Sequence, residues 1–231
     1  LLESADEGVR LEAWKSIKDL IDRGIIARED VMQRIHYFLE LLESKNERTR
    51  SEAWFNASTF VESGILTAEE LIQKKQYLLE LLKSNDELIR SEVWWWNLEN
   101  LIDIGVITKN DSRFFVELLE CDIDTGLEAW KNVDTLIGKG IITPEEVKQK
   151  KQYFLELLEL YDEWERLDAW KKVPYLVESG LLTAEELIQK KQYFLELLES
   201  DNKDVQLEAW KRVIDLLDKG VITRADLSNV M

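Results

Sequence analysis

Cysteine, histidine and proline are almost absent from this chain of 231 residues. It has one cysteine, Cys121, one histidine, His36, and two prolines. A single cysteine cannot form an internal disulfide, and such sparse use of cysteine is typical of proteins in a reducing compartment. We therefore expect a cytoplasmic location. Because a lone histidine cannot build a multi-histidine metal site, we expect no metal centre.

Motifs for nucleotide binding and for catalysis are also missing. The sequence has no G-x-G-x-x-G, no phosphate-binding P-loop and no H-E-x-x-H. No apolar run approaches the roughly 20 residues that a membrane-spanning helix needs. These absences predict a protein that carries no cofactor, performs no catalysis and does not span a membrane.

Positive charge is in short supply. The chain has 30 lysines and arginines against 47 acidic residues, which gives a net charge of −17. Proteins that bind nucleic acids gain much of their affinity when lysine and arginine neutralise phosphates, so this balance disfavours a nucleic-acid partner. It disfavours anionic membrane surfaces for the same reason. A protein partner of basic character is the expectation, because a negative field steers cations toward the surface.

A tryptophan followed ten residues later by a glycine recurs along the whole chain. The tryptophans are Trp14, Trp54, Trp95, Trp130, Trp170 and Trp210, and the glycines are Gly24, Gly64, Gly105, Gly140, Gly180 and Gly220. A period near 40 residues predicts an all-α fold, an α-solenoid of about six two-helix repeats. We predict a single α-solenoid domain over 1–231, with repeats at about 5–44, 45–84, 85–121, 122–160, 161–200 and an incomplete 201–231.

Start and stop signals support two helices in each repeat. An Asp or Asn stands eight residues before most of the repeated tryptophans, as Asn46 does, where it can cap the first helix. The repeated glycine is expected to end that helix in a left-handed conformation. The second helix then starts at a threonine with a glutamate three residues on, a capping box, as at Thr67, Thr143 and Thr183.

The junction between repeats resembles a known family. Leu1 to Trp14 reads L-L-E-S-x-D-x-x-V-R-L-E-A-W, and similar residues recur before the later tryptophans, although Gln206 stands where arginine is expected. This pattern is similar to the HEAT-like repeats, in which an L-x-x-L-L helix precedes D-x-x-V-R-x-x-A. The resemblance implies a superhelical protein-interaction scaffold whose tryptophan-bearing helices form the inner, concave layer.

The third repeat departs from the others. It reads Val93-Trp94-Trp95-Trp96 and has one extra residue between its cap and its glycine. Two interpretations are open: a π-bulge, which is frequent at functional sites, or a helix that starts one residue earlier. The second helix of this repeat also lacks five residues, around 109–115.

The residue after the repeated tryptophan is lysine in four repeats, but Phe55 in the second and Trp96 in the third. Large aromatic side chains in place of lysine favour an exposed partner-binding patch. We therefore predict Phe55, Trp94 and Trp96 as partner-binding residues. The alternative is that local packing buries them. At a later junction, Tyr161 and Trp164 are expected to cover a helix kink at Pro174, with a second contact site as the alternative.

These observations favour a non-catalytic protein–protein interaction scaffold that binds its partner on the concave face. Two alternatives remain. One is an enzyme of the DNA-glycosylase type, since one group of HEAT-like repeat proteins resembles these enzymes; that function requires a basic groove. The other is a purely structural segment of a larger protein, because the chain opens on L-L-E-S, which ends the second helix of other repeats.

Overall fold

The described part of the protein is all-α and contains no β-strand. The structure is a computed structural model that describes residues 1–228, except for the side chain of Trp96. The chain forms two compact units, residues 1–110 and residues 111–231. The boundary falls inside the third sequence repeat. A single continuous array over the whole chain therefore stays a prediction.

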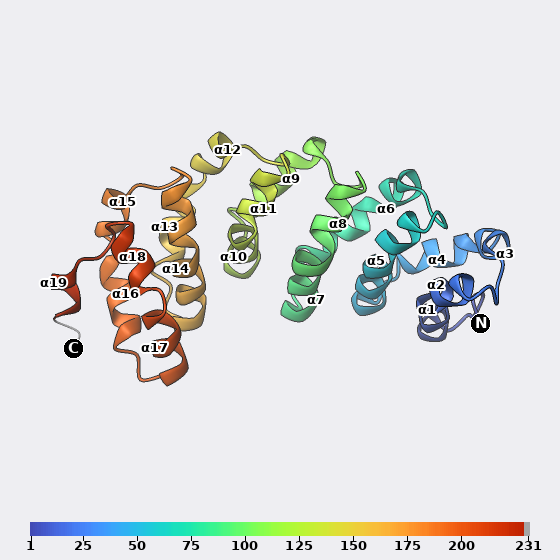
Figure 1. The fold of residues 1–231 in the computed structure, drawn as a ribbon, viewed down its shortest axis with the longest axis horizontal. Helices are drawn as coiled ribbons and strands as arrows, with labels where there is room; N and C mark the ends of the chain where they lie inside the picture. The colour runs from blue at the N-terminus through green and yellow to red at the C-terminus, as the bar shows by residue number, and fades with distance from the viewer. Residues whose placement is uncertain (229–231) are drawn as a thin grey trace. The chain divides into compact units, whose positions relative to one another are not determined.

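The first unit is built from short helices arranged in successive pairs (Figure 1, blue to green). They are α1 (Glu7–Lys15), α2 (Ile17–Asp22), α3 (Arg28–Met32), α4 (Ile35–Leu41), α5 (Glu47–Glu62), α6 (Ala68–Leu81), α7 (Glu87–Glu92) and α8 (Leu98–Asp103), with a π-helix, η1 (Val93–Asn97), between the last two. Helix α5 packs against both α6 and α1.

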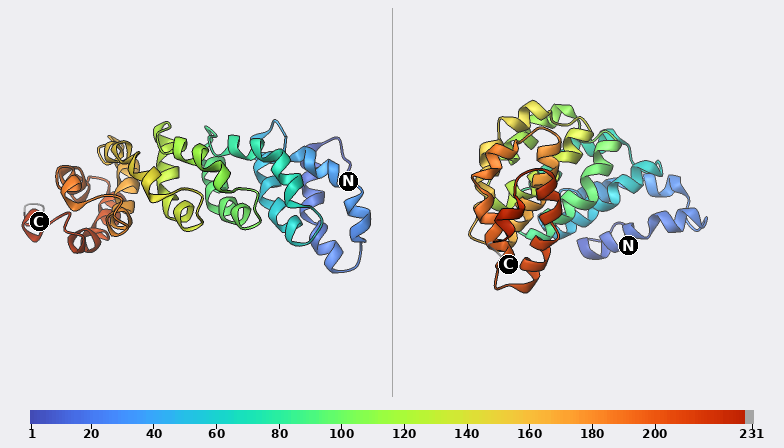
Figure 2. Two further views of the ribbon diagram at one scale, coloured as in Figure 1. Left: turned by 90° about the horizontal axis from the view of Figure 1, so that it is seen from above. Right: turned by 60° about the vertical axis from the view of Figure 1, so that its left-hand side comes forward.

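The second unit is built in the same way. Its helices are α9 (Ser112–Leu118), α10 (Ile123–Lys131), α11 (Val133–Gly138), α12 (Pro144–Lys148), α13 (Lys151–Leu157), α14 (Glu163–Glu178), α15 (Ala184–Ile188), α16 (Lys191–Leu198), α17 (Lys203–Trp210), α18 (Val213–Asp218) and α19 (Arg224–Leu227); a 3₁₀ helix, η2 (Lys109–Asp111), precedes them at the unit boundary. Helix α14 packs against α10, α13, α16 and α17, and Figure 2 shows these neighbours from two further sides.

The predicted start and stop signals are confirmed. The Asn46 carboxamide oxygen accepts the backbone N–H groups of Arg48 and Thr49 at the start of α5. At the other end of that helix Gly64 has a φ of 70°, and Ile65 N–H donates to the Phe60 carbonyl, which is the Schellman arrangement. The equivalent glycines all have positive φ. The predicted capping boxes are also present, and Thr223 forms a fourth with Asp226.

Several helices expected to be continuous are divided into two. In the second helices of three repeats, the break is a tight turn with one backbone hydrogen bond between residues three apart: Arg34 to Val31, Lys150 to Val147 and Lys190 to Leu187. Such 3₁₀-type bonds change the direction of the axis without leaving the N–H group unsatisfied. By contrast α6, which has the same Q-K-K-Q segment as the last of these, is continuous. We have no physical account of that difference.

A buried tryptophan forms the core of most repeats. Trp14, Trp54, Trp130 and Trp170 are at most 1% exposed. Each indole N–H donates to the carbonyl of a leucine 11 or 12 residues earlier, at 3.0–3.2 Å. Three of the four indoles also contact a phenylalanine of the second helix, with ring centroids 4.8–5.5 Å apart. The indole therefore fills the core, and in Trp54, Trp130 and Trp170 it also satisfies a carbonyl at the end of the preceding helix.

The third repeat absorbs its extra residue as the π-helix η1. Asp86 caps α7 eight residues before Trp94, the same spacing as in the other repeats, so the helix does not start early. Trp94 takes the core position, at 2% exposed, while Trp95 is 67% exposed. Trp94, and not Trp95, is therefore the repeated tryptophan. The insertion lies after it and lengthens the distance to Gly105 by one residue.

Hydrogen bonds within and between the repeats recur at fixed spacings. Ser44, Ser84 and Ser200 each donate to the carboxylate of a glutamate 37 residues earlier, at 2.6 Å. A buried arginine six residues after the serine reaches back to the serine carbonyl, as Arg50 does to Ser44 at 3.0 Å. Where Gln206 replaces this arginine, its amide donates to the Leu198 carbonyl instead. The junction pattern in the sequence thus specifies contacts that hold neighbouring helices together.

Replacement of Trp170 by alanine tests the role of the core tryptophan. The change leaves a cavity and an unsatisfied Leu158 carbonyl, so we expect the free energy of unfolding to fall by about 3–5 kcal/mol. Urea denaturation followed by circular dichroism measures the loss. Trp164→Ala in the same helix is the control, because that side chain is 44% exposed. An equal loss in both variants would show that burial of the repeated tryptophan is not the determining interaction.

Candidate functional site

A ladder of ion pairs runs along the tryptophan-bearing helices. The position after each buried tryptophan, which we call the ladder position, is lysine in four repeats. Lys15 contacts Glu12 in its own helix at 2.7 Å and Glu52 in α5 at 2.5 Å. Both hydrogen bonds raise the pKa of Lys15. Lys15 therefore neutralises one acid of its own repeat and one of the next.

The second unit contains the same arrangement. Lys131 contacts Glu128 at 3.0 Å and Asp168 at 2.7 Å, and Lys171 contacts Asp168 at 2.8 Å. Burial alone would raise the pKa of Asp168, but the hydrogen bonds from the two lysines outweigh it and lower that pKa. The Asp168 carboxylate therefore stabilises the folded state in its ionised form.

Aromatic side chains occupy the ladder position in the second and third repeats. Phe55 is 51% exposed, as the sequence prediction required of a partner-binding residue. With the corrected register, the third-repeat residue is Trp95, which is 67% exposed. Trp94 is buried and offers almost no surface to a partner, so we do not retain it as a contact residue. The side chain of Trp96 lies outside the described residues. The sequence reasoning thus found the exposed aromatic position but assigned it one residue too late.

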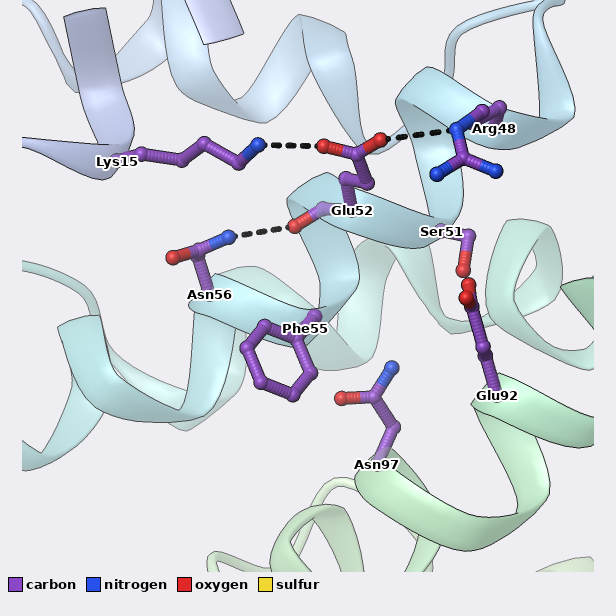
Figure 3. Close-up of a pocket in the computed structure, with 8 residues that line it drawn as sticks. All are labelled: Lys15, Arg48, Ser51, Glu52, Phe55, Asn56, Glu92 and Asn97. Carbon is purple, nitrogen blue, oxygen red and sulfur yellow. Dashed lines mark hydrogen bonds and ion pairs between the residues drawn. The ribbon is translucent and has the colours of Figure 1, made fainter. Parts of the chain in front are cut away.

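A pocket of about 380 Å³ lies beside Phe55, entirely within the first unit. Figure 3 shows the Phe55 ring and the side chains of Glu92 and Asn97 facing this space. The pocket draws on α1, α5, α7 and η1. Its lining residues are Lys15, Arg48, Ser51, Glu52, Phe55, Asn56, Glu92 and Asn97.

The two acids of the pocket differ in their partners. Glu52 contacts Lys15 at 2.5 Å and Arg48 at 3.2 Å, and its backbone carbonyl accepts the Asn56 amide at 2.7 Å. Glu92 makes no ion pair with any described residue; its carboxylate faces the Ser51 hydroxyl in Figure 3. The pocket therefore combines one neutralised carboxylate, one carboxylate without a cation, and an exposed aromatic ring.

The π-helix η1 contributes one wall of the pocket. Asn97, the last residue of η1, is only 2% exposed and lies on the wall opposite Phe55. The extra residue in this turn changes which side chains face α5, with which η1 is packed. Glu92 and Asn97 were not singled out from the sequence. An acid stands three residues before every ladder position, and this pattern could have identified Glu92 from the sequence. The direction of the Asn97 side chain depends on the π-helix η1 and could not have been identified in that way.

A second pocket, of about 500 Å³, lies at the start of α14 in the second unit. It is lined by Tyr161, Asp162, Glu163, Trp164, Arg166, Glu196 and Asn202. Tyr161 is 99% exposed, so the prediction that it covers the helix around Pro174 is wrong. Arg166 contacts Glu196 at 3.4 Å, and Glu163 accepts a hydrogen bond from Ser200. Arg166 and Glu163 are therefore engaged in contacts within their own repeat, 161–200.

Residues 1–228 show no metal site and no membrane span. No group of three or more His, Cys, Asp or Glu side chains in this range could hold a metal ion, and none of its helices is long and apolar enough to cross a bilayer. The ring of His36 lies 4.1 Å from that of Tyr37. Cys121 is a half-buried free thiol.

Comparison of the sequence with known protein families and with curated proteins finds no match.

The ladder in the second unit gives a pH-dependent prediction. Asp168→Asn removes the carboxylate shared by Lys131 and Lys171, and we expect it to lower the free energy of unfolding at pH 7 by about 1–2 kcal/mol. Because folding lowers the pKa of Asp168, its contribution is present above the ordinary value of 3.8 and is lost as the pH falls through the folded value. The difference between wild type and variant should therefore close in acid.

Urea denaturation at a series of pH values measures this difference. Asp201→Asn is the control, because Asp201 is exposed, and surface substitutions of this kind change stability by less than about 0.5 kcal/mol. A difference for Asp168→Asn that stays constant from pH 7 to pH 3 would contradict the ionic origin of its contribution.

Proposed function

We propose that the protein is a HEAT-like α-solenoid that acts as a non-catalytic scaffold for a basic protein partner. The repetition of contacts at a fixed spacing supports the solenoid. Equivalent serine–glutamate hydrogen bonds, each spanning 37 residues, recur in three repeats, and equivalent indole–carbonyl hydrogen bonds recur in four. In a solenoid each repeat contacts its neighbours in the same way, which is what such a set of contacts describes.

A solution measurement tests this architecture. A compact domain of 231 residues has a radius of gyration of about 17 Å. We expect small-angle X-ray scattering to give a clearly larger value, because a solenoid extends with each added repeat. A monomer with a radius of gyration near 17 Å would contradict the solenoid and leave only an all-α fold.

The single observation that carries the binding function is the pair of exposed aromatic residues at the ladder position. Elsewhere this position holds a lysine that neutralises acids, yet Phe55 and Trp95 expose large apolar surfaces to water at a cost in solubility. Aromatic residues with acidic neighbours are typical anchors for protein partners. The net charge of −17 favours a basic partner and disfavours nucleic acid, including the damaged DNA that a glycosylase-type enzyme would hold.

Exchange of both aromatic residues for the lysine of the other repeats tests the scaffold. We expect Phe55→Lys with Trp95→Lys to abolish retention of specific basic proteins on the immobilised chain, because the apolar anchors are lost while the core tryptophans stay in place. Affinity capture at physiological salt, quantified by mass spectrometry, provides the measurement.

The matched control replaces two exposed apolar residues of the second unit, Leu207→Lys with Ile214→Lys. These side chains are 57% and 70% exposed, so the change in charge and in apolar surface is similar. Proteins lost from the first variant and kept by the control support the scaffold. Equal retention by wild type and both variants removes the aromatic ladder positions as its binding surface.

A further inference from the structure

We propose that the pocket beside Phe55 binds a single arginine or lysine side chain of the partner, which completes the ladder where the chain's own lysine is missing. This inference rests on the proposed scaffold function and assigns a chemical specificity to one of its contacts. The occupant is a cationic side chain in a basic segment of a protein. Four features of the first unit lead to this conclusion.

The first feature is the placement of the acids. Lys15 bridges the acid three residues before it and an acid 37 residues after it, Glu52. Lys131 bridges the equivalent pair, Glu128 and Asp168. Phe55 has Glu52 and Glu92 at the same two spacings. The acids of the ladder are thus retained around Phe55, while the cation that would join them is replaced by an aromatic ring.

The second feature is the unequal neutralisation of those acids. Glu52 is held by Lys15 from one side and by Arg48 from its own helix. Glu92 has no cationic partner among the described residues, although Lys131 shows that an acid at the equivalent position can pair with the preceding ladder lysine. A cation that enters the pocket therefore meets a lining carboxylate that has no ion pair to break.

The third feature is the ring itself. An exposed phenylalanine attracts a cation over its face, and a guanidinium also stacks on it. With the ring 51% exposed and directed into the pocket, a cationic side chain can lie against Phe55 while its charged end reaches Glu92 (Figure 3). The same ring would give no advantage to an anionic group, because Lys15 and Arg48 are already paired with Glu52 and the Glu92 carboxylate would repel it.

The fourth feature is the space that is available. The pocket is open to solvent, has a volume of about 380 Å³ and is lined by charged, amide and serine side chains around one aromatic ring. This is within the range of about 300–1,000 Å³ that is usual for ligand sites. The Asn97 side chain faces the space and offers an amide oxygen as a further acceptor. Because a guanidinium has five N–H donors and an ammonium three, arginine gains more from these acceptors than lysine does.

A pair of peptides that differ only in charge tests the proposal on the full chain. The probe is a fluorescein-labelled peptide of four alternating arginine and serine pairs, and the reference replaces each arginine with citrulline, its neutral isostere. Fluorescence anisotropy at 150 mM salt measures binding. We expect saturable binding of the arginine peptide and none of the citrulline peptide. Equal affinity for both peptides would overturn the proposal, since no cation would then be recognised.

Three variants locate the binding in the pocket. Phe55→Lys places a tethered cation in the space, so we expect affinity to fall at least tenfold while the melting temperature stays the same or rises. Glu92→Gln removes the unpaired carboxylate, so we expect a fall of at least threefold. Glu62→Gln removes one charge from an exposed residue of the same helix, α5, and should change affinity by less than twofold.

Equal losses in Glu92→Gln and Glu62→Gln would show that only the overall charge attracts the peptide, and would overturn the proposal. Phe55→Lys could lower the melting temperature. The double variant Phe55→Leu with Glu92→Gln then takes its place, and unchanged peptide binding in that double variant would overturn the proposal.

The scaffold proposal and the cation-pocket proposal can also fail separately. Partner capture that depends on Trp95 but not on Phe55 or Glu92 keeps the scaffold and rejects the cation pocket. Pocket-dependent peptide binding without any retained partner does the reverse.

Discussion

The hydrogen bond from a buried indole to a leucine carbonyl is the interaction on which the rest of this structure depends. Helix ends leave carbonyl groups without partners, and such groups are costly to bury. In three repeats the tryptophan N–H satisfies one of these carbonyls while the rings fill the core. One residue type thereby joins two helices and fixes the depth at which they pack. The residue that follows it is consequently placed at a constant position on the surface.

Long-range polar contacts add register to this packing. Lys150 contacts Glu120, Lys151 contacts Glu186 and Lys191 contacts Asp226, each across 30 or more residues. Single pairs of this kind contribute little to stability, since they are partly exposed and screened by salt. Together these ion pairs favour one register of the helices, because a helix that shifted by one residue would lose its ion pairs to the neighbouring helices.

Most of the helical architecture could be predicted because its signals are local. The caps at Asn46 and Thr67 and the left-handed Gly64 depend on residues a few positions away, and the structure confirms them. The site was predicted only in part. Phe55 was found from the missing lysine, but the core role of Trp94 and the exposure of Trp95 depend on where a helix absorbs an insertion. In the structure the insertion forms η1, which packs against α5, and this contact between distant segments is not visible in the sequence.

The ladder position has a consequence for how such a chain can change over generations. Its side chain points away from the tryptophan core, so lysine, phenylalanine and tryptophan are all accommodated there while Trp14, Trp54, Trp94, Trp130 and Trp170 stay buried. A mutation at this position can therefore change the exposed surface without opening a cavity in the core. Each repeat has one such variable surface position, at a regular interval along the chain. A chain built in this way can change its surface chemistry one repeat at a time, by single substitutions that leave the packing of the tryptophans intact.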